Sequence, residues 1–326
     1  MITRIHRARG LAAACIATWA LVACGGGSGN ASNSGAGSSN GIPSTGVSGQ
    51  DSSTPALTNN VATDGRAWLN YRRSQVGMSM LAENPKIDLA AQGHSDYQRI
   101  NNVVTHVQTA GKQGFTGAQL QDRLSNAGYT IIGANAIGEV ISASKSGSGF
   151  YMAEQLITAI YHRFVIFEPV FKEIGSGSAT TSAPYIYFTA DFAANNGYGA
   201  GLAAGTVAVW PFNGQIDVPA SFNSDLEEPD PAPNQGVVGY PVSVHINLTS
   251  TLAVQSFTIR AHGSSTDLST RLLSKATDPN MAANASAAAA IIPSSALAAG
   301  TTYDVSFTGT VDGAAVSKNW SFTTAK

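Results

Sequence analysis

The segment 137–142, "IGEVIS", places one carboxylate, Glu139, among apolar and small residues. Its composition predicts a strand that enters a hydrophobic core. Burying a lone carboxylate costs several kcal/mol unless another group pairs with it. We therefore expect Glu139 to have a specific partner, and that partner decides which chemistry this region can perform.

Other residue types that could do chemistry give weaker signals. His94 lies on the apolar face of a predicted helix, where a histidine is more often a hydrogen-bonded core residue than a ligand. Ser95 follows it on the same helix, so the two side chains diverge and no Ser–His pair is expected. Glu168 and Glu173, in "EPVFKEIG", are expected to be solvated. No Gly-x-Ser-x-Gly elbow, P-loop or nucleotide-binding fingerprint occurs in a suitable setting.

The elements that must position these residues are helices and strands in the first dense region of the chain. Asp64 and Asn84 are the predicted N-caps of the first two helices, and Pro169 ends the fourth. Period-2 alternation in "PYIYFTADF" predicts a strand. The four predicted helices cover residues 63–77, 84–102, 116–129 and 150–171.

The last region of the chain is predicted to be all strand. Residues 301–324 alternate in polarity on both sides of Asp312-Gly313, which is a strong hairpin signal. Several strands at this spacing predict a sandwich. The Ala-rich segment 281–293 is interpreted as a connection or a short helix. The acidic segment 225–236, "DLEEPDPAPNQG", is interpreted as a solvated loop, with a Ca²⁺ site as the alternative.

The N-terminus predicts export and a lipid anchor. Three Arg precede a short apolar run, which has the pattern of a signal peptide and is too short for a membrane-spanning helix of about 20 residues. The run ends in "LVAC", which resembles a bacterial lipobox. The resemblance implies removal of residues 1–23, lipidation of Cys24 and, because Gly25 follows, an outer-membrane or cell-surface location. The Gly/Ser-rich residues 24–62 then form a flexible tether.

Composition excludes some partners. The formal net charge is −2, and loss of the leader with its Arg residues makes it more negative, so the chain offers no basic field for nucleic acid. Of the two cysteines, Cys15 lies in the leader, so the mature protein has no disulfide. The chain has 326 residues with 43% hydrophobic content, enough for two domains, which we place at 63–205 and 206–326.

The first domain resembles bacterial members of the CAP (SCP-like) superfamily of cysteine-rich secretory and pathogenesis-related proteins. The resemblance rests on "LNYRRSQVGMSMLAENPKIDLAAQGHSDY", "THVQTAGKQGFTG", "DRLSNAGY", "IGEVIS", "YHRFVIFEPVFKEIGSG" and "YIYFTADF", which occur in the family's order over residues 64–200. It implies an α+β fold, an α-β-α sandwich with a long cleft. In the family the cleft holds two His and two Glu. The two His match His106 and His162 here, and one Glu matches Glu139. The second Glu has no convincing counterpart, since Glu154 lies eight residues before His162, and Val140 replaces the usual Asn.

This resemblance gives Glu139 a role. The hypothesis is that Glu139 faces the cleft and pairs with His106, His162 or both, which would raise the imidazole pKa values. The alternative is that Glu139 only accepts hydrogen bonds from backbone amides. Two His and one Glu could also hold Zn²⁺ or another divalent metal with a position open for water. If the protein is an enzyme, His106, Glu139 and His162 are its expected catalytic residues.

The second domain resembles bacterial Ig-like domains, a β-sandwich that implies a spacer or adhesive module. The leading interpretation is a lipoprotein that acts as a binding module at the cell envelope, for a lipid or other apolar ligand and with a divalent metal as a candidate cofactor. One alternative is a metal-assisted hydrolase acting on peptide or cell-wall substrates. Another is a surface adhesion or structural protein.

Overall fold

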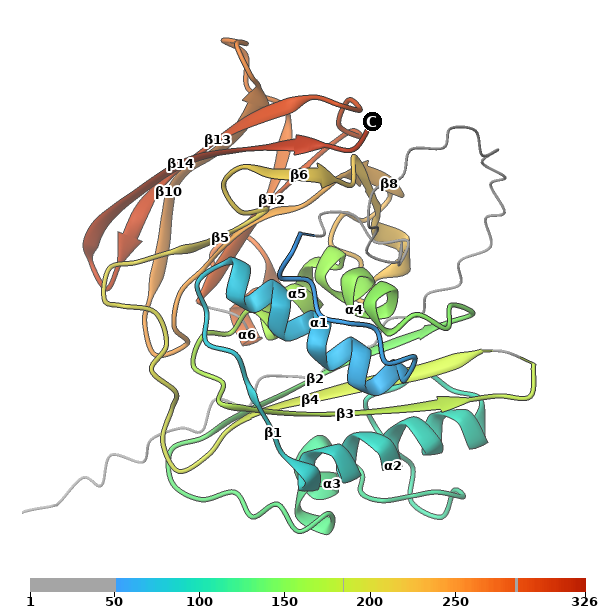
Figure 1. Ribbon diagram of the computed structural model, residues 1–326. Coiled ribbons are helices and arrows are strands. Elements are labelled where there is room, and N and C mark those ends of the chain that lie inside the picture. The colour runs from blue at the N-terminus through green and yellow to red at the C-terminus, as the bar shows by residue number, and fades with distance from the viewer. Residues whose placement is uncertain (1–50, 184, 285–286) are drawn as a thin grey trace, which may run out of the picture.

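The computed structural model describes residues 51–183, 185–284 and 287–326. The predicted signal peptide, the lipidation site Cys24 and the tether up to residue 50 lie outside these residues. In Figure 1, α1 (Val61–Gln75), α4 (Gly149–Thr158) and α5 (Ile160–Ile166) lie on one side of a four-stranded sheet. The helices α2 (Pro85–Asn101) and α3 (Leu120–Asn126) lie on the other side. The expected α-β-α sandwich is therefore present.

The central sheet has the strand order β1-β3-β4-β2. Its strands are β1 (Ala82–Glu83), β2 (Ala136–Ser144), β3 (Glu173–Thr180) and β4 (Ile186–Ala194). β2 and β4 are antiparallel, and Glu139 lies directly opposite Asp191. Directly opposed side chains share one face of a sheet, so the two carboxyl groups lie side by side.

Two glycines of β3 let α2 lie unusually close to the sheet. A Cβ atom at Gly175 would lie 2.3 Å from the backbone nitrogen of Asp88, and one at Gly177 would lie 2.3 Å from the Cα of Gln92. No side chain fits in that space. The close approach brings the buried face of α2, which carries His94, onto β3 and β4, and β4 pairs with β2, the strand that carries Glu139.

Helix boundaries differ from the prediction for the first, third and fourth helices. The third is shorter than expected, since α3 begins at Leu120 and ends at Asn126. α1 begins earlier than expected, because Asn60 is its N-cap and its side chain accepts a hydrogen bond from the backbone N–H of Thr63. Asp64 instead lies in the first turn and accepts bonds from the backbone and hydroxyl of Thr58, at 2.8 and 2.7 Å. The prediction for the second helix is confirmed, with Asn84 as N-cap and Pro85 in the first turn.

The predicted long fourth helix is wrong, since the chain forms two shorter helices. Ala159 has an extended conformation (φ −69°, ψ 119°) that separates α4 from α5. The backbone N–H groups of Ile160 and Tyr161 therefore find no carbonyl in the preceding turn, and a side chain from the second domain, Glu227, accepts their hydrogen bonds instead. This break sets the position of His162.

The second domain contains many strands, as expected. One sheet has the order β10-β13-β14-β6 and another β11-β12-β9-β5, while β7 and β8 form a pair. The Asp312-Gly313 hairpin is confirmed, with φ values of +51° and +83° at the turn. The Ala-rich segment begins in the short helix α6, which was one of the two interpretations, and then continues into the buried strand β12, which was not expected. The identification as an Ig-like domain stays a prediction.

The elements of the second domain have the following bounds: β5 (Ala208–Trp210), β6 (Gln215–Val218), β7 (Ser221–Asn223), the 3₁₀ turn η1 (Ser224–Leu226), β8 (Val237–Gly239), β9 (Val242–His245), β10 (Leu252–Ala261), β11 (Thr270–Leu273), α6 (Pro279–Asn284), β12 (Ala288–Pro293), β13 (Thr302–Val311) and β14 (Ala314–Thr324).

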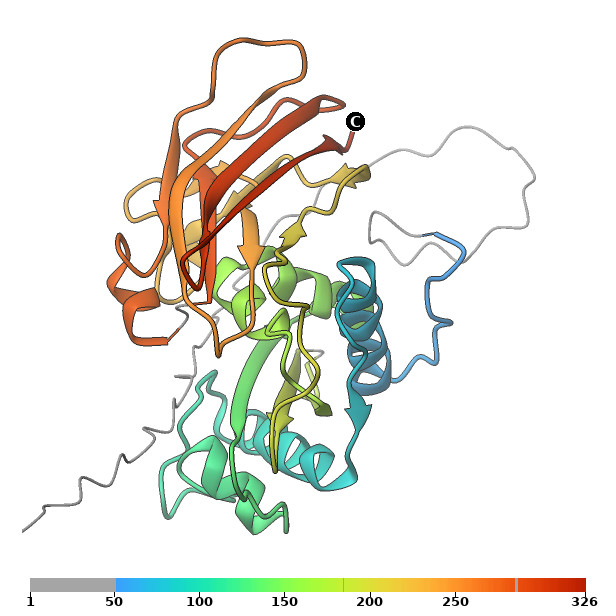
Figure 2. The same cartoon turned by 90° about the vertical axis from the view of Figure 1, so that its left-hand side faces the viewer.

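The two domains share one hydrophobic core. Figures 1 and 2 show the second domain on the α4–α5 side of the first. The ring of Phe167, at the end of α5, packs against Trp210 and His245, with centroid distances of 5.3 and 5.4 Å. The guanidinium of Arg163 donates to the carbonyl of Pro241 at 2.7 Å. The second domain therefore packs against the helix that carries His162.

Two acidic side chains that were expected to be solvated, Glu168 and Glu173, are buried or half-buried. Glu168 is buried at this interface, where its carboxylate accepts from the backbone N–H groups of Leu248 and Val170 at 3.1 and 3.2 Å. Glu173 is half-buried, and the hydroxyl of Tyr129 donates to it at 2.5 Å.

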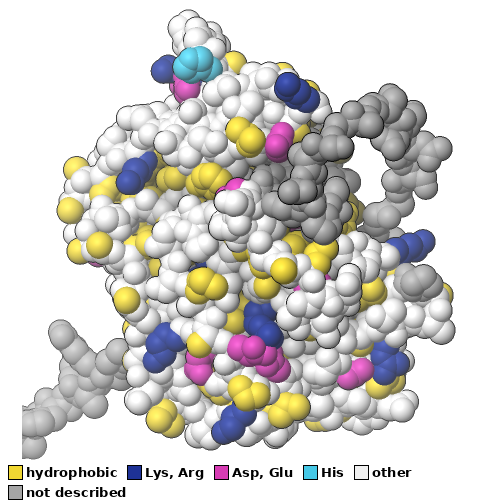
Figure 3. Space-filling model, in the orientation of Figure 1, with side chains coloured by type: hydrophobic (Ala, Val, Ile, Leu, Met, Phe, Trp, Pro, Cys, Tyr) yellow, Lys and Arg dark blue, Asp and Glu magenta, His cyan; other side chains and the backbone are white. Residues whose placement is uncertain are grey.

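Charged side chains are sparse on the face of the molecule shown in Figure 3. Among the described residues, no helix is both long and apolar enough to cross a membrane.

Candidate functional site

Glu139 is fully buried and has two side-chain partners. Its Oε1 lies 2.7 Å from Nδ1 of His106, and its Oε2 accepts a bond of 2.6 Å from the guanidinium of Arg123. Burial alone would raise the pKa of Glu139, but the positive charge of Arg123 and the contact with His106 hold it well below its usual range. The expected pairing with His106 is present. The partner of His162 is a different acid.

Arg123 also fixes the loop that carries His106. Its guanidinium donates to the backbone carbonyl of His106 at 2.9 Å, while the same side chain neutralises Glu139. One cation therefore positions both members of the pair. The segment "DRLSNAGY" contributes to the resemblance in sequence, but nothing local indicates that its arginine would be buried next to Glu139.

Asp191 adds a second buried carboxyl group beside Glu139. Among the described residues, neither of its side-chain oxygens has a hydrogen-bond partner. Burial, and then the negative charge of Glu139, raise the pKa of Asp191 well above its usual range. Burial therefore favours the neutral form of Asp191, whereas Arg123 and His106 favour the charged form of Glu139.

His94 is the core residue that the sequence predicted. Its Nε2 donates to the carbonyl of Thr105 at 2.7 Å, and its Nδ1 accepts from the side-chain amide of Gln108 at 2.9 Å. Because both ring nitrogens are occupied, neither is available to a ligand. Burial lowers the pKa of His94 to about 4, so the ring is neutral at neutral pH.

His106 is held in one tautomer. A carboxylate can only accept, so Nδ1 carries the proton that bonds to Glu139, and Nε2 keeps its lone pair. Nε2 is buried and has no hydrogen-bond partner among the described residues. The pairing does not raise the pKa of His106 as expected, because burial lowers it by more than the hydrogen bond to Glu139 raises it.

His162 has the same arrangement with an acid from the second domain. Its Nδ1 lies 3.0 Å from Oε1 of Glu227, which is 1% exposed and follows η1. Its Nε2 is also buried and lacks a partner in the part of the chain that the structure describes. The interpretation of "EEPDP" as a wholly solvated loop is therefore wrong at Glu227, although Glu228 is exposed.

The three predicted site residues thus fall into two separate pairs, His106 with Glu139 and His162 with Glu227, an acid that the sequence did not predict for the site. Burial is the main cause that lowers the pKa of His106, and a positive charge on His162 would lower it further. In the described ranges, no group of three or more His, Cys, Asp and Glu could hold a metal ion. The metal set of His106, Glu139 and His162 stays a prediction, and in this arrangement both oxygens of Glu139 are engaged by His106 and Arg123.

Glu154, the acid that the sequence offered as a counterpart of the family's second Glu, lies on α4 and is bonded to α1. Its Oε2 accepts from the indole of Trp68 at 2.6 Å and from the guanidinium of Arg72 at 2.9 Å. These bonds connect α4 to α1. Glu154 therefore stabilises the helical layer and does not contact either site histidine.

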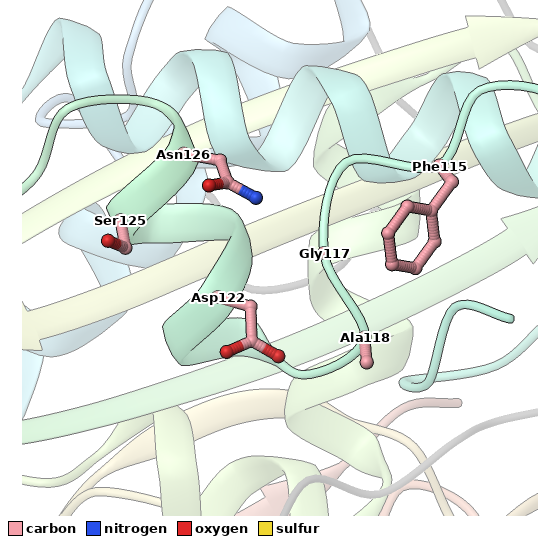
Figure 4. A pocket seen from close by; sticks show the side chains of 6 residues that line it. All are labelled: Phe115, Gly117, Ala118, Asp122, Ser125 and Asn126. Carbon is pink, nitrogen blue, oxygen red and sulfur yellow. The ribbon is translucent and has the colours of Figure 1, made fainter. Parts of the chain in front are cut away.

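Two surface hollows lie apart from these residues. One, of about 320 Å³, lies between α3 and the preceding loop (Figure 4), but its polar side chains bond locally: Asp122 accepts from the backbone of Gln119, and Asn126 donates to the carbonyl of Thr116. The other, of about 330 Å³, lies over β10, β13 and β14 and is lined by Arg260 among others. Neither is lined by His106, Glu139 or His162.

The chain was compared with curated proteins, solved structures and family models, and a family model matches its first domain. No curated protein matches the chain. Among solved structures, an extracellular protein containing an SCP domain from Bacillus anthracis is 22% identical, with a TM-score of 0.34, over 43% of this chain and 44% of its own length. The chain thus spans less than half of that protein. An outer surface protein of Borrelia burgdorferi is 11% identical, with a TM-score of 0.34, over 40% of this chain and 90% of that one. Residues 67–192 match the family model of CAP, the Cysteine-rich secretory protein family, which supports a CAP (SCP) domain in this part of the chain.

Proposed function

We propose that this protein is an exported CAP-domain binding module whose ligand site is centred on the imidazoles of His106 and His162. One observation carries the proposal. Each imidazole is bonded through Nδ1 to a buried carboxylate, and each has a buried Nε2 to which no described residue is hydrogen-bonded. Buried polar atoms are rarely left without a partner unless a ligand or water completes them.

Zn²⁺ or a similar divalent metal is the ligand that fits these atoms. Metal-binding histidines usually donate their second ring N–H to a carboxylate, which orients the ring and makes the free nitrogen a better ligand. Glu139 and Glu227 stand in that outer position, so the protein would contribute two nitrogen ligands. A bound metal would supply a Lewis acid whose remaining positions are open to water or to an anionic group of an envelope ligand.

The arrangement favours binding over hydrolysis. Glu139 is paired with Arg123, and burial raises the pKa of Asp191 well above its usual range. Glu227 is occupied by backbone N–H groups and by His162. Among the described residues, the two carboxylates that contact the site histidines are thus already engaged, which favours binding over a general-base role for them.

An apolar ligand is the second candidate. Apolar side chains are exposed on the end of α2 and on the loop that carries His106, at Ile100, Val103, Val107 and Phe115. A lipid could contact these side chains while a polar headgroup approaches the loop. The basic leader and the lipobox-like "LVAC" support export and anchoring at the cell surface through Cys24.

The proposal is tested by calorimetric titration of the mature protein, purified without chelator, with Zn²⁺. We expect one ion per chain, and we expect binding to be lost in His106→Ala. His262→Ala is the matched control, because that imidazole is exposed and bonded to Asp304 in the second domain. Absence of Zn²⁺ binding, or equal binding by wild type and His106→Ala, would refute the metal site.

A further inference from the structure

The second domain reaches into the first through Glu227. The carboxylate accepts from the backbone N–H groups of Ile160 and Tyr161 at 2.8 and 2.7 Å, and from that of His162 at 3.3 Å. It also bonds to Nδ1 of His162 at 3.0 Å. All of these donors belong to the first domain. A single side chain therefore holds both the backbone and the ring of His162.

These backbone contacts explain why α5 begins where it does. The first N–H groups of a helix have no partner inside the helix, and a negative charge near them is favourable. Glu227 satisfies three of them immediately after the extended residue Ala159. The acid thus stabilises the break between α4 and α5, and the break determines where His162 projects.

The residues on either side of His162 are also held by the second domain. The hydroxyl of Tyr161 bonds to the carboxylate of Asp278 at 2.7 Å. The guanidinium of Arg163 bonds to the carbonyl of Pro241 and to the hydroxyl of Ser243, at 2.7 and 3.2 Å. Three consecutive side chains therefore depend on the second domain for their position.

We propose that Glu227 is a positioning residue of the site and that the second domain is an integral part of the site. This rests on the proposed function of the His106 and His162 pair. Glu139 of the first domain fixes one imidazole, and Glu227 of the second domain fixes the other. A ligand held by both imidazoles therefore stabilises the packing of the two domains, and that packing in turn strengthens ligand binding, because such coupling is reciprocal.

The tautomer of His162 is the most direct consequence. With Glu227 as acceptor, Nδ1 carries the proton and Nε2 keeps its lone pair. In Glu227→Gln, the amide N–H₂ must occupy one of the two oxygen positions, and each position already faces a backbone N–H, that of Ile160 at Oε2 or that of Tyr161 at Oε1. The variant therefore loses both a backbone hydrogen bond and the negative charge that holds the ring proton on Nδ1. The Nε2–H form of His162, which blocks Nε2 as a ligand, then becomes populated.

The test uses the full mature chain and two measurements. Nitrogen-15 NMR of the histidine rings should show the Nδ1–H form of His162 in wild type and in Glu228→Gln, the control at the exposed neighbouring residue. In Glu227→Gln it should show a population of the Nε2–H form that wild type lacks. Zn²⁺ affinity should fall about 10- to 100-fold in Glu227→Gln, the usual effect of losing such an outer partner. Glu228→Gln should bind as wild type does.

The outcomes separate this inference from the proposed function. If His106→Ala abolishes Zn²⁺ binding but Glu227→Gln alters neither the tautomer nor the affinity, the inference is overturned and the metal site stands. If wild type binds no Zn²⁺, the metal site fails, while the tautomer change still supports positioning by Glu227. If Glu227→Gln does not fold, the wild-type spectrum decides: an Nε2–H form of His162 would overturn the inference.

Discussion

Glu168 makes the stability of this protein depend on pH in a direction opposite to that of most carboxylates. It lies at the domain interface, and burial raises its pKa from 4.5 to about 7, although bonds from the Leu248 and Val170 amides and the charge of Arg73 act in the other direction. The folded state therefore holds the Glu168 proton more tightly than the unfolded state. The stability that this proton supplies is complete below pH 4.5 and is lost as the pH rises to about 7.

The size of the effect follows from the two pKa values. A rise from 4.5 to about 7 corresponds to about 3 kcal/mol, which is an upper bound for the loss between acid and neutral pH. Glu168→Gln keeps a carbonyl oxygen for the backbone N–H groups of Leu248 and Val170 but cannot ionise. The variant should therefore escape this loss.

Urea unfolding of wild type and Glu168→Gln at pH 5 and pH 8 measures the effect. The free energies of unfolding should be similar at pH 5, and at pH 8 the variant should be more stable by up to about 3 kcal/mol. Other titrating groups cancel in this difference because both proteins contain them. The exposed Glu228→Gln should show no such gain. Equal stability of Glu168→Gln and wild type at pH 8, or a less stable variant, would refute the reasoning.

Two further substitutions test the packing around the site. Arg123→Met removes the cation from buried Glu139 and should lower the free energy of unfolding by about 3–5 kcal/mol in urea denaturation, whereas a loss below 1 kcal/mol would mean that Glu139 has other support. Gly177→Ala would place a Cβ atom 2.3 Å from the Cα of Gln92 and should cost about 1–3 kcal/mol or more, measured as a lower melting temperature. Gly147→Ala, with open space around its Cβ, is the control, and equal melting temperatures for the two variants would contradict the steric argument.

The sequence predicted those elements whose signals are local. The second helix has a capping Asn84 and a proline at its start, and both act within one turn. The hairpin at Asp312-Gly313 depends on two adjacent residues that adopt positive φ. The ordered CAP-like segments identified the pair of His106 and Glu139 because that resemblance carries information on residues far apart in the chain.

What the sequence did not predict depends on distant contacts. The apolar periodicity of residues 150–171 continues through Ala159, and only a carboxylate from the second domain makes the break favourable. Ala-rich residues favour helix locally, yet β12 is a strand because it pairs with β9 in a buried sheet. Glu227 lies in an acidic, Pro-rich segment that has the composition of a solvated loop. Its burial depends on donors about 65 residues earlier in the chain.

The contact of Phe167 with Trp210 and His245 has a practical consequence for any attempt to divide this protein. Cutting the chain near residue 205 would leave large aromatic surfaces facing water on both pieces. Each fragment would then tend to precipitate or to recruit a foreign apolar partner. Exchanging the C-terminal half for an unrelated domain by recombination would expose the same aromatic surface to water. The two halves are therefore expected to be inherited together.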